Sequence, residues 1–325
     1  MNYHQNEENP GSFSHSSPSN LPAPKTGRIW INGLLFVITI VTTMLTGAFH
    51  LGILWGDVWH HLPLILVGWK YSFAVLLILT THEMGHYLAA RWHGVPVTLP
   101  YYIPVPFEGF HFGTMGAFIK IKAPIPNRRV LMDIGAAGPL AGFVVSLIFL
   151  TYGYLTLPGL EGIIAHVETI HPWDTSGGIP LTLGYSLLFY FFNGILGGGV
   201  LPMSEAYHFP FIFAGWIGFL VTALNLLPIG QLDGGHIIYA MFPRRSKVLN
   251  RLAFGGLVLL SVILFIEKGA FGSVWVPWMI ILTFIGLRHP PTLDDTIELT
   301  SRQRFWGWVC IVIFFLCFIP LPVYF

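Results

Sequence analysis

Charged residues are scarce in this chain of 325 residues: they make up 10% of it, against about 25% in soluble domains. Hydrophobic residues make up 54%, and the mean hydropathy is +0.68. This composition predicts a protein that is solvated mostly by lipid. The net charge of +1 gives no case for nucleic-acid binding, so no nucleic-acid partner is expected.

Cysteine is also scarce, because the chain holds just Cys310 and Cys317. They lie seven residues apart in the last apolar run, so on a helix they share a face. We interpret both as small apolar thiols of a protein core. The sequence therefore predicts no disulfide framework.

Long apolar runs, by contrast, are abundant. A membrane helix needs about 20 mostly apolar residues, and the sequence predicts an all-α polytopic membrane protein with about seven transmembrane helices. The stretch 181–200 is also apolar, but glycines and Asn193 interrupt it, and we expect it to lie at the outer surface or to re-enter the membrane. The seven runs are 30–52, 62–92, 130–157, 210–234, 250–267, 270–288 and 305–323.

Lysine and arginine gather between these runs in a pattern that predicts orientation. Basic residues near helix ends stay on the cytoplasmic side, and with seven spans all the basic clusters fall on one side. The N-terminus is then cytoplasmic. The clusters are Lys25 and Arg28; Arg91, Lys120, Lys122, Arg128 and Arg129; Arg244, Arg245, Lys247 and Arg251; and Arg288, Arg302 and Arg304.

The segment 95–127 contains six prolines, which forbid a continuous helix. Between them the stretch 113–122 is typical of a strand, because apolar and polar residues alternate at its end. We expect a small membrane-associated β-hairpin, which dips into the cytoplasmic side of the helical bundle. Residues 1–26 are rich in Ser, Asn, Pro and Glu, and they are predicted to form a disordered tail.

The second run contains the sequence His82-Glu83-Met84-Gly85-His86. Four residues on a helix turn through about 400°, so His82 and His86 sit one above the other and can bind one zinc ion. Glu83 lies close by in angle and can take the proton of a water molecule. Placing histidine and glutamate within an apolar span costs free energy, so residues of this kind usually have a function. We predict a site for one Zn²⁺ per chain, with Glu83 as the general base.

A catalytic zinc needs a third protein ligand and an open position. Asp233, at the end of the run 210–234, is the candidate that we favour, and Asp133 is its rival. His236 is expected to lie near the site rather than to bind the metal. His93 is interpreted as a surface histidine at a helix end.

Asn225 lies shortly before Asp233 and is separated from it by Pro228, which breaks the helix. An amide at this place can donate a hydrogen bond to a substrate carbonyl as it becomes an oxyanion. An ordinary hydrogen bond between helices is the alternative interpretation of Asn225.

HEMGH followed by NLLPIGQLDGG at 225–235 resembles the site-2 protease family of intramembrane zinc metalloproteases. The stretches 113–142 and 208–228 look like its chloroplast and bacterial branch. The resemblance implies regulated cleavage of single-span membrane proteins, with zinc bound by His82, His86 and Asp233. It implies catalytic roles for Glu83 and Asn225.

The resemblance also guides the expected organisation of the chain. Residues 27–240 are predicted to form the protease core and 241–325 to form C-terminal transmembrane helices. No stretch between the spans is long enough for the PDZ domain that some members of the family carry. A bacterial inner membrane is the expected location.

The strand at 113–122 suggests how a substrate is held. A peptide must leave its helix before it can be cut, and an open strand edge can bind it by strand addition. We therefore predict contacts between the substrate and Gly113, Gly116, Phe118 and Ile119.

A transporter or channel is the competing class of protein, since its ion path also needs buried His, Asp and Glu. An ion path needs polar groups along its whole length, and many transporters contain internal repeats. Here those groups concentrate at two motifs, which favours the protease.

Overall fold

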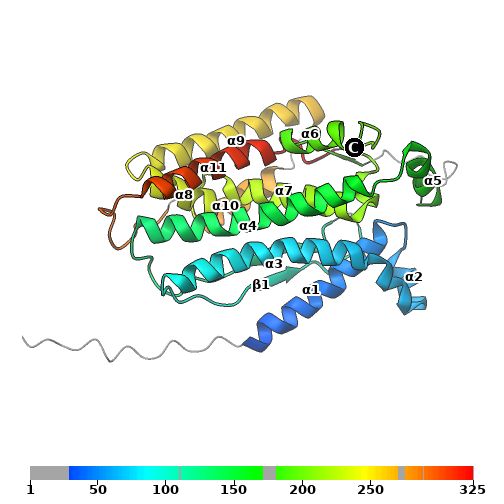
Figure 1. Cartoon of the computed structure of the whole chain (residues 1–325), viewed down its shortest axis with the longest axis horizontal. Helices are drawn as coiled ribbons and strands as arrows, with labels where there is room; N and C mark the ends of the chain where they lie inside the picture. The colour runs from blue at the N-terminus through cyan, green and yellow to red at the C-terminus, as the bar shows by residue number, and fades with distance from the viewer. Residues whose placement is uncertain (1–28, 110, 171–180, 270–274, 288, 325) are drawn as a thin grey trace, which may run out of the picture.

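The computed structural model describes residues 29–109, 111–170, 181–269, 275–287 and 289–324. The tail predicted at 1–26 lies outside these residues. Helices dominate, and α1, α3, α4, α9 and α11 run along the long axis of the molecule (Figure 1).

The first half of the chain contains α3, which carries His82, Glu83 and His86, and α4, which borders them. In chain order the elements are α1 (Ile29–Phe49), α2 (Trp55–His60), the 3-10 helix η1 (Leu62–Gly68), α3 (Trp69–Trp92), β1 (Tyr101–Pro104), β2 (Thr114–Phe118), α4 (Arg128–Leu155) and α5 (Leu160–Ile170).

The second half adds α7 and α8, which bring Asn225 and Asp233. Its elements are β3 (Thr182–Leu183), α6 (Leu187–Ile195), the 3-10 helix η2 (Ala206–His208), α7 (Pro210–Leu226), α8 (Asp233–Met241), α9 (Ser246–Lys268), α10 (Trp275–Ile285), α11 (Ser301–Cys317) and β4 (Val323–Tyr324).

Four helical segments of the described part of the chain are long and apolar enough to cross a membrane. The predicted count of seven spans is not confirmed, because α7 and α11 have 17 residues and α10 has 11. Seventeen helical residues extend about 26 Å, less than the roughly 30 Å of a hydrocarbon core. The four segments are Ile29–Phe49, Leu62–Trp92, Arg128–Leu155 and Ser246–Lys268.

Proline accounts for much of this shortening. Pro228 lies two residues after the end of α7, so the predicted run 210–234 divides into α7, a turn and α8. Pro320 lies beyond the end of α11 in the same way. The interrupted stretch 181–200 contains the nine-residue helix α6, which is too short to span.

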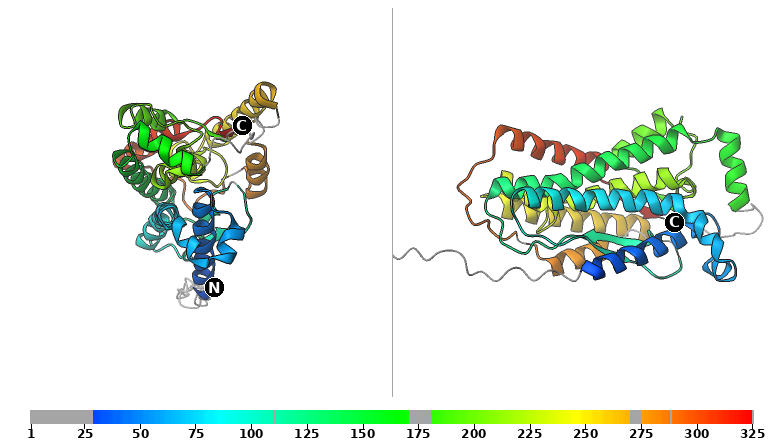
Figure 2. Two further views of the ribbon diagram at one scale, coloured as in Figure 1. Left: turned by 90° about the vertical axis from the view of Figure 1, so that its right-hand side faces the viewer. Right: turned by 60° about the horizontal axis from the view of Figure 1, so that its bottom comes forward.

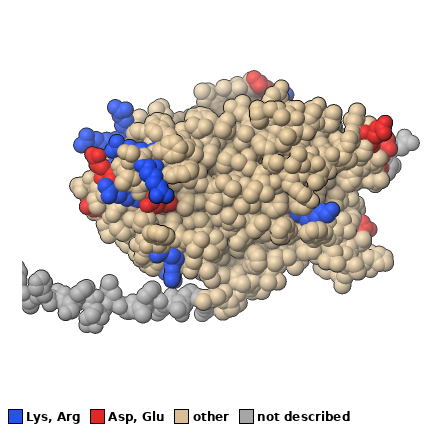
Figure 3. Space-filling view, in the orientation of Figure 1, with Lys and Arg blue, Asp and Glu red and all other residues tan. Residues whose placement is uncertain are grey.

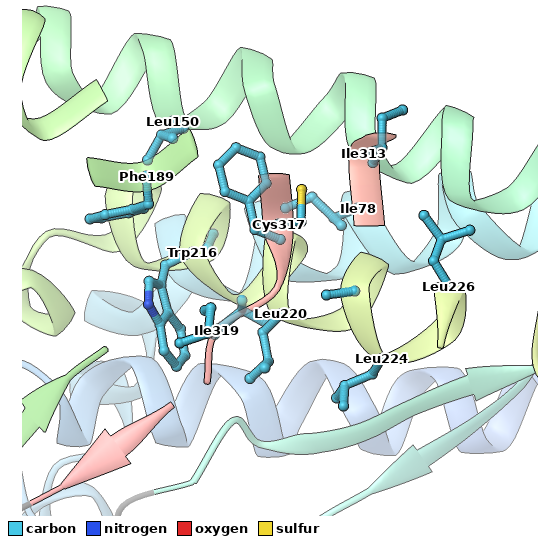
Figure 4. Packing of buried hydrophobic residues seen from close by; sticks show 14 of the residues in the cluster. Ile78, Leu150, Phe189, Trp216, Leu220, Leu224, Leu226, Ile313, Cys317 and Ile319 are labelled. Atoms are coloured by element: carbon cyan, nitrogen blue, oxygen red, sulfur yellow. The ribbon is translucent and has the colours of Figure 1, made fainter. Parts of the chain in front are cut away.

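The core lies between α3, α4, α7 and α11. Helix α4 packs against both α3 and α7, and α11 packs against α7 and α4. Figure 4 shows Ile78, Leu150, Trp216 and Cys317 meeting from these four helices. Both cysteines are free and buried, so the interpretation of Cys310 and Cys317 as core thiols is confirmed.

The start of α4 is fixed by a side chain. Asn127 is the N-cap residue, and its side-chain oxygen accepts hydrogen bonds from the backbone N–H groups of Arg129 and Val130, at 3.0 and 3.1 Å. An N-cap of this kind satisfies donors that the first turn leaves without a helical partner. The helix that borders the site therefore begins at a defined position.

Strands β1 and β2 pair antiparallel beside α1 and α3. Their register pairs Tyr101 with Phe118 and Tyr102 with Ala117. Helix α1 supports the pair, since the Asn32 amide donates to the carbonyls of residues 99 and 100. That the pair dips into a membrane stays a prediction.

Lysine and arginine on the face shown in Figure 3 gather mainly at one end of the molecule. Comparison with Figure 1 places this end where α4, α9 and α11 begin. The opposite end carries α5 and, in Figure 2, α2 lies close to it. Basic side chains are thus concentrated at one end of the long helices, where acidic side chains also lie.

Candidate metal centre

Helix α3 supplies the first three side chains of the site. His82, Glu83 and His86 are each buried, with 3%, 6% and 6% of their surface exposed. They belong to the segment Leu62–Trp92, which is long enough to cross a membrane. The two imidazoles lie on one face of the helix, as their spacing predicts, with ring centroids 4.8 Å apart and an edge-to-face arrangement.

Asp233 completes a triangle of possible ligand atoms. Nε2 of His82 lies 3.1 Å from Nε2 of His86, and Oδ2 of Asp233 lies 3.3 and 3.2 Å from these two nitrogens. Among the described residues, these three form the group that can hold a metal ion. Asp233, rather than its rival Asp133, therefore lies beside the imidazoles.

The ring of His86 is held in one orientation. Its Nδ1 lies 2.7 Å from the carbonyl oxygen of Ile134 in α4. A carbonyl can only accept, so Nδ1 carries the proton and the lone pair of Nε2 points into the triangle. Contacts of this kind orient metal-binding histidines.

Glycines of α4 make room for both imidazoles. A Cβ atom at position 138 would lie 2.1 Å from Nε2 of His86, and one at position 142 would lie 3.1 Å from Cβ of His82. The sequence motifs described above do not include Gly138 and Gly142. The signal that could have found them is their spacing of four, which puts small residues on one helix face.

Asp233 is the first residue of α8, and two glycines place it. A Cβ atom at Gly234 would lie 2.0 Å from the Leu226 carbonyl, and one at Gly235 would lie 2.3 Å from the Gly230 carbonyl. Only glycine permits such contact, so α8 starts directly against the turn that follows α7. This is the physical reason for the two glycines after Asp233.

Asp133 belongs to a different cluster. Its Oδ2 lies 2.9 Å from Nε2 of His93, and its Oδ1 accepts a hydrogen bond from Gln303 at 2.9 Å. His93, expected to be a surface histidine at a helix end, thus contacts Asp133 and is still partly exposed. His236 is not in the triangle, and its Nδ1 lies 2.6 Å from Nε2 of His289.

The two predicted catalytic side chains both border the triangle. The Glu83 carboxylate lies near the backbone of Ile119, just after β2. The amide nitrogen of Asn225 lies 3.2 Å from Nε2 of His82. The end of the strand, the acid and the amide therefore meet at one place.

The remaining predicted substrate contacts differ in their surroundings. Gly113 packs against α1, since a Cβ there would lie 2.7 Å from Cα of Thr43. Gly116 has φ +102° and open space around it, and Phe118 is half exposed. Gly113 is thus shielded by α1, whereas Gly116 and Phe118 remain accessible.

The donor set fits zinc. A tetrahedral zinc ion with bonds of about 2.0–2.1 Å holds its ligand atoms roughly 3.3 Å apart. The three separations in the triangle, 3.1, 3.2 and 3.3 Å, match this value. Two imidazoles and a carboxylate also form one of the ligand sets of catalytic zinc sites.

Comparison with known proteins agrees with a zinc site. The sequence profile described as Peptidase family M50 matches residues 70–266, more than half of the chain. The chain is 28% identical to "Probable zinc metalloprotease EGY2, chloroplastic" of Oryza sativa subsp. indica, over 88% of this chain and 49% of the relative. No solved structure matches.

Two further relatives have similar names. The chain is 30% identical to "Probable zinc metalloprotease EGY1, chloroplastic" of Oryza sativa subsp. japonica, over 80% of this chain and 42% of the relative. It is 28% identical to the EGY2 protein of Arabidopsis thaliana, over 79% and 42%. The chain thus spans about half the length of the curated relatives that it matches. On the family match, the chain belongs to Peptidase family M50, the site-2 protease family.

Proposed function

We propose that this protein is an intramembrane zinc metalloprotease that hydrolyses peptide bonds of membrane-anchored proteins. The observation that carries the proposal is the triangle of His82, His86 and Asp233 beside Glu83, on a helix long enough to cross a bilayer. One zinc ion per chain is held by these three ligands. The family membership and the names of the relatives support the same activity.

The chemistry follows from an open metal position next to a carboxylate. Zinc in such a site lowers the pKa of water towards about 7 and polarises a carbonyl group. Glu83 accepts the proton of the attacking water and later delivers it to the leaving amine. The backbone of Ile119 lies near this carboxylate, on the strand side of the site.

Asn225 is proposed to act on the substrate carbonyl. Its amide nitrogen lies at the edge of the triangle, 3.2 Å from Nε2 of His82. Because an amide N–H donates, it can bond the oxygen that gains negative charge during attack. Its place at the end of α7, directly before the turn at Pro228, leaves it facing the site.

Substrate is proposed to bind along β2. The accessible residues Gly116 and Phe118 lead to Ile119, whose backbone lies near the catalytic carboxylate. A single-span substrate that unwinds and adds to this edge would bring its backbone to Glu83. Hydrogen bonds to the main chain depend little on the identity of side chains. Substrates should therefore share helix-weakening residues rather than a sequence motif.

The site is proposed to lie towards the cytoplasmic side of a lipid bilayer, with a cytoplasmic N-terminus. Support comes from the gathering of basic residues at one end of the molecule (Figure 3). The division into a tail (1–26), a protease core (27–240) and C-terminal helices (241–325) is part of this proposal. The chloroplast names of the relatives lend no support to a bacterial inner membrane.

Metal content tests the ligand set. Asp233→Ala should lose most of the zinc that purifies with the wild type, because it removes one side of the triangle. Asp133→Ala is the matched control, since its carboxylate bonds His93 and Gln303 instead. If Asp133→Ala lost the metal and Asp233→Ala kept it, the proposed third ligand would be wrong.

A further inference from the structure

A segment without regular structure joins α10 to α11 and lies beside the metal centre. We call its described residues, 286–287 and 289–300, the connector. Figures 1 and 2 place it at the end of the molecule where α4 begins. It lies beyond residues 70–266, which the family profile matches.

The connector contacts α8 through two side chains. Nε2 of His289 lies 2.6 Å from Nδ1 of His236, one helical turn after Asp233. The ring of His289 also stacks on Tyr239, with centroids 4.4 Å apart and planes 22° apart. The hydroxyl of Tyr239 donates to Oδ2 of Asp295 at 2.6 Å.

The bond between the two histidines has a defined direction. Nδ1 of His289 lies 2.5 Å from the carbonyl oxygen of Pro290, so that nitrogen is the donor. Burial lowers the pKa of His289, which favours the neutral ring. Its Nε2 is then an acceptor, and Nδ1 of His236 donates to it.

The connector is itself fixed to the start of α4. The N–H groups of Leu293 and Asp294 donate to the carbonyls of Ile125 and Pro126, at 3.0 and 2.9 Å. Asp295 is further held by the Thr292 hydroxyl, at 2.6 Å. A side chain on α8 is thus tied to the helix whose glycines border the imidazoles.

A second contact lies on the other side of Asp233. Gly230 has φ +57°, and a Cβ there would lie 2.1 Å from the Gly286 carbonyl. The first residue of the connector therefore touches the turn that leads into α8. Asp233 lies between two stretches that the connector contacts.

Helix α8 depends on its neighbours for its position, on α4 as well as on the connector. It has nine residues, and its N-cap Leu232 offers no side-chain hydrogen bond. Helices this short are marginal by themselves, so packing decides where they sit. A shift of α8 would carry the Asp233 carboxylate away from the two imidazoles.

We propose that His289 and Asp295 are positioning residues, which hold α8 so that Asp233 stays in the metal triangle. The inference rests on the proposed function for the identity of the metal. The C-terminal part of the chain thereby has a role in metal affinity, although none of the three proposed ligands belongs to it.

The test measures zinc affinity of the purified, metal-free protein by competition with a chromophoric chelator. His289→Ala and Asp295→Ala should each weaken zinc binding by roughly 10–100-fold, the usual effect of removing a partner that orients a ligand. His289→Gln keeps an acceptor for His236 and should recover part of the affinity. Asp294→Ala is the matched control, because that carboxylate bonds Thr296 within the connector.

The same variants should lower kcat on a cleavable reporter more than they raise KM. Zinc affinity equal to wild type in folded His289→Ala and Asp295→Ala would overturn the inference, as would an equal loss in Asp294→Ala. If His289→Ala does not fold, Tyr239→Phe decides, because it removes only the hydroxyl that binds Asp295. Wild-type affinity in that variant also overturns it.

The two proposals fail in different ways. Cleavage by Glu83→Gln at the wild-type rate would contradict the proposed function, while zinc affinity, measured without turnover, would still test the positioning. A wild-type chain that bound no zinc would contradict both.

Discussion

At the scale of residues, the site depends on the side chains that form the triangle and on glycines that leave space for them. The HEMGH pattern predicts His82, Glu83 and His86 on one helix, because their spacing matches a helical turn. It cannot predict the partner from α8, since 147 residues separate His86 from Asp233. The second motif and the resemblance were needed to favour Asp233 over Asp133.

Gly138 shows what residue patterns miss. Its contribution is the space left by a missing side chain, so no chemical group marks it in the sequence. The structure reveals this role because the ring of His86 occupies the place of a Cβ. Similarly, His289 looks like an isolated polar residue until its contact with His236 is seen.

We predict that Gly138→Ala removes zinc and activity. The added methyl would stand 2.1 Å from Nε2 of His86, closer than any Cβ contact allows, so the imidazole must leave the triangle. Zinc content after purification should fall to a small fraction of wild type. Gly255→Ala in α9 is the control, because nothing lies within 4 Å of its Cβ. Full zinc content in Gly138→Ala would show that α4 can move away without cost.

At the scale of elements, the predicted runs locate the helices better than they locate their ends. The run 130–157 corresponds to α4, whose start is set by the Asn127 cap. The run 210–234 instead divides at Pro228, because proline cannot continue the hydrogen-bonding of a helix. Hydropathy does not register such a break, so it overestimated the length of α7.

The strand at 113–122 was placed correctly in sequence, with β2 covering 114–118. Its pairing indicates which edge is open. The backbone of Lys120 is hydrogen-bonded to Thr98, on the side of β1. Successive residues of a strand direct their N–H groups to alternate sides, so those of Ala117 and Ile119 point away from β1. The backbone of Ile119 lies near Glu83, in agreement with this assignment.

We predict that Ala117→Pro impairs cleavage while zinc content stays normal. Proline removes a backbone donor from the edge on which we expect the substrate to pair. Ala117→Val keeps that donor and serves as the control. The readout is cleavage of a single-span reporter by folded, zinc-loaded protein. Equal rates for the two variants would mean that the hairpin is a plug rather than a binding edge.

At the scale of the whole molecule, charge and hydropathy predicted a lipid-solvated helical bundle, and the described helices fit that class. The number of spans did not follow, because α7, α10 and α11 are shorter than a bilayer core. Short helices in the interior of a bundle can rely on neighbours, which a window of sequence does not register.

We predict that the basic end of the molecule is cytoplasmic. Single exposed cysteines at Lys122 and Lys247 should react with a membrane-impermeant maleimide only in permeabilised cells, whereas one at Ala165 should react in intact cells. The native Cys310 and Cys317 are buried and should give little background. Labelling of a cysteine at Lys247 in intact cells would contradict the predicted orientation of α9.

The most direct test of the account is Glu83→Gln in purified protein. The substitution keeps the shape of the side chain and leaves all three ligands in place, so we predict one zinc ion per chain, as in the wild type. It removes the general base, so cleavage of a single-span substrate in proteoliposomes should fall by roughly 10²–10⁴-fold. Cleavage at the wild-type rate by zinc-loaded Glu83→Gln protein would contradict the proposed mechanism.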